Sequence, residues 1–153
     1  MKFFLWILVF FMVALQAEDT ASTKKIVNAE SYLASIHSKQ IESKDLYKLM
    51  NDDKEKFLLI DIREQDQIAH GEIYHDDFLA ITRGYLEFKI EKQVPDKNAK
   101  IVVYCSSGKR GNLAVKTLKD MGYTDVISLK GGITQWVNEG YPLFTVYGDV
   151  FIK

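Results

Sequence analysis

The sequence predicts an α/β fold, with about five mostly parallel strands in one sheet and helices on both faces of that sheet. The short apolar segments at 57–60 and 101–104 have the length and composition of strands that are buried on both faces, and the segment at 126–129, in which Ser128 stands among apolar residues, is predicted as another strand. Segments with helical apolar spacing separate these runs, and strands that alternate with helices form right-handed βαβ units. The chain has 153 residues and a formal net charge of −1, which suits one globular domain.

The N-terminal segment is predicted to be an export signal. Lys2 precedes an unbroken apolar run from Phe3 to Leu15, and Ala17 stands before a polar stretch. This order is typical of a secretory signal peptide, here residues 1–17, and it predicts a periplasmic protein. An uncleaved anchor in the inner membrane is the alternative, although the run is shorter than the about 20 apolar residues that a bilayer span needs.

The remaining chain is divided into a polar leader, 18–38, and a folded domain, 39–153. Apolar residues in the leader recur at three- and four-residue spacing, which favours a short amphipathic helix. In the domain, Ser43 is a favourable N-cap for the first helix. The other elements expected before residue 100 are a strand at 57–60, a short helix at 64–70 closed by Gly71, a weak strand at 78–81, a loop and short helix at 83–88, and a turn at 95–98.

The second half of the domain contains the clearest elements. The strand at 101–104 leads directly into Cys105, and after a turn of small residues a helix begins at about Lys109 and ends at Gly122. The strand at 126–129 is followed by a glycine pair and a last helix, which Gly140-Tyr141-Pro142 ends.

Cys105 is the only cysteine, so the chain cannot form an internal disulfide. It stands at the carboxyl end of a predicted parallel strand, and Asp61 stands at the end of another. Binding sites in parallel sheets lie beyond the carboxyl ends of the strands. We therefore expect Cys105 and Asp61 to face one crevice.

The residues after Cys105 are those that stabilise a thiolate. Ser106, Ser107 and Gly108 allow the backbone to curl so that successive N–H groups point inward, and the start of the next helix adds partial positive charge. Lys109 and Arg110 add formal positive charge. The same N–H groups would hold the charge of a persulfide, so we expect neither a metal nor a cofactor. This mechanism requires a thiol that reagents in water can reach and amides that face it.

Four motifs together resemble the rhodanese-like family, over about residues 40–142. These are the L-L-I-D-I-R-E run at 58–64, R-G-Y-L-E-F at 83–88, the C-x-x-G-x-R loop at 105–110, and G-G-x-x-x-W at 131–136. The resemblance implies a rhodanese-like fold and a single-domain sulfurtransferase. Such an enzyme moves a sulfane sulfur from a thiosulfate- or polysulfide-type donor to cyanide or a thiol, through a persulfide on Cys105.

The resemblance also implies roles for particular residues. Cys105 would be the sulfur-carrying nucleophile, inside the loop from Ser106 to Arg110. Asp61 would orient this loop or its Arg110, whereas Arg63 would lie at the surface or face the substrate. Arg83 would meet an anionic donor at the pocket rim. The chain departs from the G-H-I-P-G-A of many relatives at 71–76, where it reads G-E-I-Y-H-D.

Other functions are open alternatives. The domain could be a carrier that binds sulfane sulfur at Cys105 without turnover and delivers it to a partner enzyme. A phosphatase or arsenate reductase is disfavoured because its C-x5-R loop is one residue longer, and a redox role lacks a resolving cysteine. No basic stripe marks a nucleic-acid partner. The oligomeric state is left open.

Overall fold

The computed structural model describes residues 28–52 and 54–151. The predicted signal peptide and residues 18–27 of the predicted leader lie outside this range. The chain divides into two compact units, Met1–Ser31 and Tyr32–Lys153, and the fold described below is that of the second. The elements in chain order are α2 (Ala29–Ala34), β1 (Gln40–Ile41), α3 (Ser43–Met50), β2 (Leu58–Asp61), α4 (Gln65–Ala69), β3 (Phe78–Ala80), the 3-10 helix η1 (Arg83–Tyr85), α5 (Leu86–Gln93), β4 (Ile101–Tyr104), α6 (Lys109–Asp120), β5 (Val126–Leu129), α7 (Gly132–Asn138), β6 (Leu143–Thr145) and β7 (Gly148–Val150).

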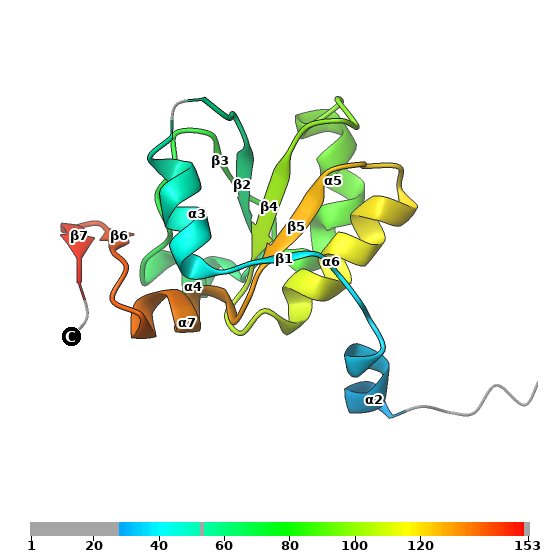
Figure 1. The fold of residues 1–153 in the computed structure, drawn as a ribbon, viewed down its shortest axis with the longest axis horizontal. Helices are drawn as coiled ribbons and strands as arrows, with labels where there is room; N and C mark the ends of the chain where they lie inside the picture. The colour runs from blue at the N-terminus through cyan, green and yellow to red at the C-terminus, as the bar shows by residue number, and fades with distance from the viewer. Residues whose placement is uncertain (1–27, 53, 152–153) are drawn as a thin grey trace, which may run out of the picture. The chain divides into compact units, whose positions relative to one another are not determined.

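A five-stranded sheet forms the centre of the domain, in the order β1-β5-β4-β2-β3 (Figure 1). All four pairings are parallel, which confirms the predicted fold class. The central strand β4 is buried at all four positions, as its continuous apolar sequence predicts. Because the strands are parallel, their carboxyl ends meet at one edge of the sheet, and Cys105 follows β4 at this edge.

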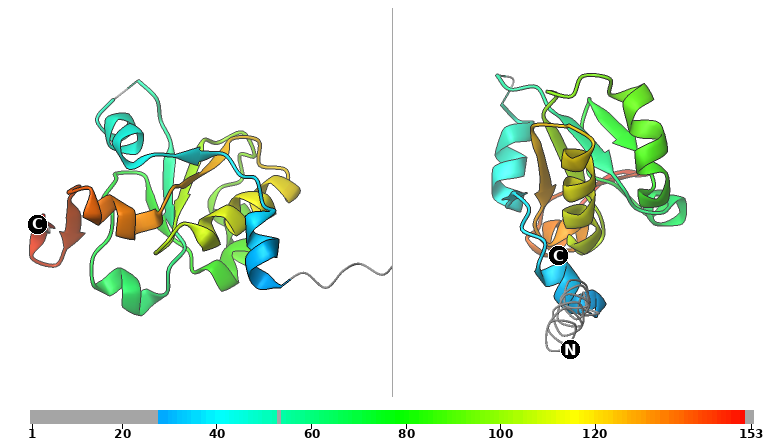
Figure 2. Two further views of the ribbon diagram at one scale, coloured as in Figure 1. Left: turned by 60° about the horizontal axis from the view of Figure 1, so that its bottom comes forward. Right: turned by 90° about the vertical axis from the view of Figure 1, so that its right-hand side faces the viewer.

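Two apolar clusters fill the space between the sheet and the helices on its two faces. Ile101 and Val103 of β4 pack in one cluster with residues of α5 and α6, whereas Val102 and Tyr104 point to the other face, toward α3 and α7. This alternation is the two-residue period of a strand. The end-on view in Figure 2 shows α3 and α5 on opposite sides of the sheet.

The observed elements differ from the predicted ones mainly at helix and strand boundaries. Helix α6 begins at Lys109, and Gly122 follows it with a φ of +94°, both as expected. The first helix differs, because Ser43 lies inside α3 and Glu42 is its N-cap. Ser43 is fully buried and its Oγ has no hydrogen-bond partner, so the predicted capping role of Ser43 is wrong.

A C-terminal hairpin, β6–β7, was not predicted. The backbone of Phe144 in β6 forms two hydrogen bonds with that of Glu72, at 2.8 and 2.9 Å, so the hairpin is attached to the loop before β3. Tyr74 packs on Phe144 with ring centroids 5.2 Å apart. Over residues 28–52 and 54–151, the structure contains no helix with the length and hydropathy needed to cross a membrane.

Candidate active site around Cys105

Cys105 begins the loop between β4 and α6. The Gly108 N–H is directed at its sulfur, with a distance of 3.2 Å from N to Sγ. Gly108 caps α6 with a φ of +83°, and a Cβ at this position would lie 3.0 Å from the Gly131 nitrogen. Only glycine combines this left-handed conformation with so close a neighbour. The glycine of the C-x-x-G-x-R motif therefore places one amide on the thiol.

The start of α7 holds the loop from its other side. The N–H of Ile133 donates to the carbonyl oxygen of Cys105 at 2.9 Å, and that of Thr134 donates to the Ser106 carbonyl at 3.0 Å. In a planar trans peptide the carbonyl and the following N–H point in opposite directions. The N–H groups of Ser106 and Ser107 are consequently turned away from α7.

This attachment depends on Gly132. It has a φ of +60°, and a Cβ would lie 2.3 Å from the Cys105 carbonyl oxygen. Such a contact is far shorter than van der Waals distance, so a side chain here would force the loop and α7 apart. The glycine pair of the G-G-x-x-x-W motif thus allows α7 to approach the loop.

Gln67, which we did not predict as a site residue, lies against the outer part of the loop. Its Oε1 accepts a hydrogen bond from Arg110 Nη2 at 3.1 Å, and its Nε2 lies 3.3 Å from Ser106 Oγ. Arg110 Nη2 also donates to Ser106 Oγ at 3.1 Å. The three half-buried side chains form one polar network where the loop meets solvent, a place that we call the mouth of the loop. Residues separated by 39 and 43 positions meet here, so no local sequence pattern indicated the contact.

Asp61 and Arg63 form a buried ion pair beside this network. Arg63 Nη2 lies 2.7 Å from Asp61 Oδ2, Nε donates to both carboxylate oxygens, and the two residues are 0% and 5% exposed. Burial opposes the charge of Arg63, but hydrogen bonds to Asp61 and its negative charge outweigh burial and raise the pKa of Arg63. Asp61 therefore pairs with Arg63 instead of Arg110, and the predicted surface position of Arg63 is wrong.

The Asp61–Arg63 pair supports the helix that carries Gln67. Arg63 Nη1 donates to the backbone carbonyl of Gln67 at 3.2 Å, and Nη2 donates to that of Gly71 at 2.7 Å. The first bond adds to the one that the Gln67 carbonyl receives from the His70 N–H, and the second gives a partner to the carbonyl of Gly71, just beyond the end of α4. Asp61 thus reaches the active loop indirectly, through Arg63 and α4.

Tyr104 completes this buried cluster. Its ring lies under the Arg63 guanidinium, with Cζ 5.6 Å from the ring centroid, and its hydroxyl accepts a hydrogen bond from the Ile73 N–H at 3.2 Å. Burial and the neighbouring Asp61 carboxylate raise the pKa of Tyr104 well above its usual range. Tyr104, the residue before Cys105, is therefore a neutral phenol at physiological pH.

Arg83 lies in a different environment from the one predicted. Its Nη1 forms an ion pair with Glu87 at 2.7 Å, and its Nη2 donates to Thr117 Oγ1 at 3.0 Å. Both partners are on helices, α5 and α6. The guanidinium thus ties these helices together, and it is not a free cation at a pocket rim.

The thiol itself is less accessible than the mechanism requires. Cys105 is 1% exposed, whereas Ser107 and Lys109 in the same loop are exposed and Ser106 and Arg110 are half-buried. Successive amides were expected to face the sulfur, but in this loop the structure shows one hydrogen bond to it, from the Gly108 N–H, and Cys105 is buried beneath the loop surface. Part of the loop or of its neighbours must therefore move before a reagent in water can reach the sulfur.

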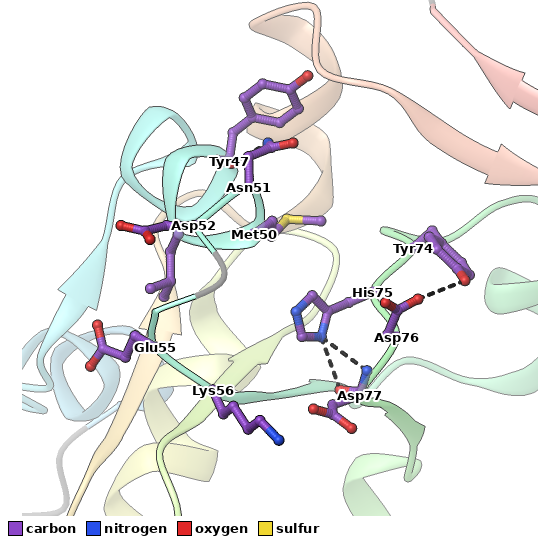
Figure 3. A pocket seen from close by; sticks show the side chains of 11 residues that line it. Tyr47, Met50, Asn51, Asp52, Glu55, Lys56, Tyr74, His75, Asp76 and Asp77 are labelled. Atoms are coloured by element: carbon purple, nitrogen blue, oxygen red, sulfur yellow. Dashed lines mark hydrogen bonds between the residues drawn. The ribbon is translucent and has the colours of Figure 1, made fainter.

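A cavity of about 370 Å³ lies at the opposite, amino edge of the sheet. The end of α3 and the loops before β2 and β3 line it, and His75 points into it (Figure 3). Cys105 and its loop are not among the lining residues. In the described part of the chain, no three His, Cys, Asp or Glu side chains are grouped as metal ligands.

Two curated proteins and a solved structure are similar to this chain. A sulfurtransferase of Allochromatium vinosum is 34% identical over 109 residues, which cover 71% of this chain and 97% of that protein. A thiosulfate:glutathione sulfurtransferase of Saccharomyces cerevisiae is 25% identical over 129 residues, covering 78% and 86%. A Rhodopseudomonas palustris structure, described as a protein of unknown function and possible tyrosine phosphatase, superposes with a TM-score of 0.67 at 28% identity, covering 80% and 98%.

The family model for the rhodanese-like domain matches residues 42–139. This range runs from the start of α3 to the end of α7 and includes Asp61, the Cys105 loop and Gly132. The chain belongs to the rhodanese-like domain family.

Proposed function

We propose that the protein is a sulfurtransferase that carries sulfur as a persulfide on Cys105. The observation that carries this proposal is the Gly108 N–H aimed at Cys105 Sγ from 3.2 Å, in a loop held from behind by α7. An amide fixed in this position stabilises negative charge on sulfur without reorganising during the reaction. The names of the two sulfurtransferase relatives support the same chemistry.

The reaction takes place in two displacement steps. The Cys105 thiolate attacks the outer sulfur of a sulfane donor such as thiosulfate. A bond forms between Sγ and that sulfur, the donor S–S bond breaks, and sulfite leaves with the electron pair. An acceptor thiolate or cyanide then attacks the outer sulfur of the persulfide, and Cys105 leaves as the thiolate. Each step exchanges one bond to sulfur for another and needs no oxidant.

The donor must first reach a sulfur that is only 1% exposed. Ser106, Gln67 and Arg110 are half-buried and are joined by hydrogen bonds of 3.1–3.3 Å at the mouth of the loop. We infer that the donor enters by displacing these side chains, because the backbone beneath them is attached to α7.

Intact mass spectrometry tests this proposal. After incubation with thiosulfate or inorganic polysulfide and removal of the donor, we expect an adduct of one sulfur on Cys105, which cyanide or glutathione then removes. An unmodified protein under all donors would contradict sulfur transfer. Release of many moles of thiocyanate or glutathione persulfide per mole of protein would indicate an enzyme. Release of one mole per mole of protein, without turnover, would indicate the carrier alternative.

We also propose that the protein is exported to the periplasm after removal of residues 1–17. This proposal rests on the order of charged, apolar and small residues at the N-terminus, which lies outside the described part of the chain. The intact mass of the protein recovered from the periplasm should correspond to a chain that begins at Glu18. A full-length mass in the membrane fraction would favour the anchored alternative.

A further inference from the structure

We propose that Gln67 makes the active site selective for anionic sulfur donors, because it holds Arg110 in place without neutralising its charge. This inference rests on the proposed function and names a feature of the substrate, its negative charge. It assigns Gln67 as a positioning residue that acts through Arg110.

Three arginines follow the carboxyl ends of β2, β3 and β4, and their partners differ. Arg63 is paired with Asp61 at 2.7 Å, and Arg83 with Glu87 at 2.7 Å. Arg110 instead donates to a neutral amide oxygen of Gln67 and a neutral hydroxyl of Ser106, both at 3.1 Å. Among the described residues, Arg110 is the arginine of this group whose hydrogen-bond partners carry no charge.

The nearest carboxylate to Arg110 is engaged elsewhere. Glu64 lies 3.7 Å from Arg110 Nη1, and its side chain is 56% exposed. It also forms a capping box with Gln67, in which its carboxylate accepts the backbone N–H of Gln67 at the start of α4. An exposed ion pair at this distance contributes little, because water screens it. Arg110 therefore keeps most of its charge at the mouth.

The position of Gln67 is itself fixed. Its backbone carbonyl accepts a hydrogen bond from Arg63, and its Oε1 also lies 3.3 Å from the Glu64 backbone N–H. The side-chain amide is thus attached to α4 at one end and to the loop at the other. A glutamate in this position would have the same shape but would form a charged pair with Arg110 and neutralise its charge at the mouth.

The rates of Cys105 alkylation by iodoacetate and iodoacetamide measure the charge at the mouth. The two reagents have the same reactive carbon and similar size and differ by one negative charge, so the ratio of their rates cancels the reactivity of the thiol. We expect Gln67→Glu to lower the ratio of the iodoacetate rate to the iodoacetamide rate about fivefold to tenfold. A negative charge added a few ångströms from the approaching reagent has an effect of this size. High salt should reduce this difference.

Two further variants separate charge from packing. Gln67→Met keeps the side-chain length but removes the amide that holds Arg110, so it should lower the ratio by about twofold, less than Gln67→Glu does, because Arg110 keeps its charge. Gln93→Glu makes the same chemical change on an exposed residue at the end of α5 and should leave the ratio unchanged. An unchanged ratio in Gln67→Glu, or an equal fall in Gln67→Met, would overturn the inference.

The donor reaction completes the test. Formation of the sulfur adduct from thiosulfate, which is an anion, should slow in Gln67→Glu by a factor similar to that for iodoacetate. If the ratio changes as expected but the wild type forms no sulfur adduct, the charge selectivity holds and the sulfurtransferase proposal fails. If folded wild-type protein reacts with neither alkylating reagent, the thiol is out of reach and both proposals fail.

Discussion

The two edges of the central sheet carry polar residues in different ways. At the carboxyl edge, hydrogen bonds join residues 31, 39 and 43 positions apart, as in the contacts of Tyr104, Ser106 and Arg110. At the amino edge, a cavity of about 370 Å³ is present, and the side-chain hydrogen bonds of its lining residues are local apart from one ion pair, between Lys100 and a Glu55 side chain that is 55% exposed. Tyr74 bonds to Asp76 and His75 to the backbone of Asp77, each two positions away.

This difference supports the carboxyl edge as the candidate site, although the cavity lies at the amino edge. A charged side chain stays in one place when its hydrogen-bond partners belong to separate secondary-structure elements. At the carboxyl edge these partners come from β2, α4, the Cys105 loop and α7. Local contacts in exposed loops leave side chains free to move. We therefore expect substitutions at the carboxyl edge to affect stability and sulfur transfer much more than matched substitutions at the amino edge.

The largest contrast is expected between Cys105 and His75. Cys105→Ser should abolish the sulfur adduct in intact mass spectra, because no other sulfur nucleophile of this type exists in the chain. His75→Ala removes the side chain that points into the amino-edge cavity and should leave adduct formation unchanged (Figure 3). Loss of the adduct in His75→Ala, or its retention in Cys105→Ser, would reverse the assignment of the two edges.

The next contrast compares two aspartates. Asp61→Asn leaves the buried Arg63 guanidinium without its counter-charge, and we expect the free energy of unfolding to fall by about 3–5 kcal/mol. Asp76→Asn alters an exposed contact with Tyr74 and should change it by no more than about 0.5 kcal/mol. Urea titration of the two variants measures both values. Similar losses would show that the Asp61–Arg63 pair does not anchor the carboxyl edge.

Two glycine variants test how the close approach of α7 to the Cys105 loop contributes to stability. Gly132→Ala combines a φ of +60° with a Cβ 2.3 Å from the Cys105 carbonyl, whereas Gly140→Ala has a φ of +83° and no atom within 4 Å. The left-handed backbone alone costs about 1–2 kcal/mol. We expect this loss in Gly140→Ala, and a larger loss, with slower sulfur loading, in Gly132→Ala. Equal losses in urea titration would mean that the close approach of α7 is unimportant.

The smallest effect is expected at high pH, for two tyrosines. The folded state raises the pKa of Tyr104 well above its usual value, through burial and Asp61. Above pH about 10 the unfolded chain loses this proton while the native protein keeps it, so the free energy of unfolding falls by up to about 1.4 kcal/mol per pH unit. Below that pH the contribution is constant.

Tyr104→Phe should therefore remove part of the fall in stability between pH 10 and 11. The pKa of Tyr74 at the other edge is also raised, by its hydrogen bond to Asp76, but this tyrosine is exposed. Tyr74→Phe should change the pH dependence much less. Denaturant titrations at pH 9, 10 and 11 compare the two, and parallel curves for wild type and Tyr104→Phe would contradict the role of burial.

Much of the fold was predictable because its strongest elements are locally encoded. The apolar runs at β2, β4 and β5 are buried on both faces, and such strands are recognised by continuous hydrophobicity. β1 consists of two residues, Gln40–Ile41, and exists only because β5 pairs with it. The β6–β7 hairpin has exposed residues such as Tyr147 and Val146, so no apolar period indicated it.

The site was predictable to the same degree. The position of Cys105 at a strand end and the glycines of its loop follow from local sequence. The partners of its charged residues do not follow from local sequence. Arginine is a residue type of the surface, and Arg63 is buried only because Asp61 lies beside it. Gln67 carries no chemical signal of its own, and its contact with Arg110 arises from the packing of α4 against the loop.

The two hydrogen bonds from α7 to the Cys105 and Ser106 carbonyls also limit how the loop can change in evolution. They join consecutive residues of the loop to consecutive residues of the helix, so an inserted residue would have to bulge outward at the exposed Ser107 or displace the helix. Displacing α7 would disturb Trp136, which is fully buried in the core below. A longer anion-binding loop therefore requires either an insertion at Ser107, on the exposed side of the loop, or accompanying changes in α7.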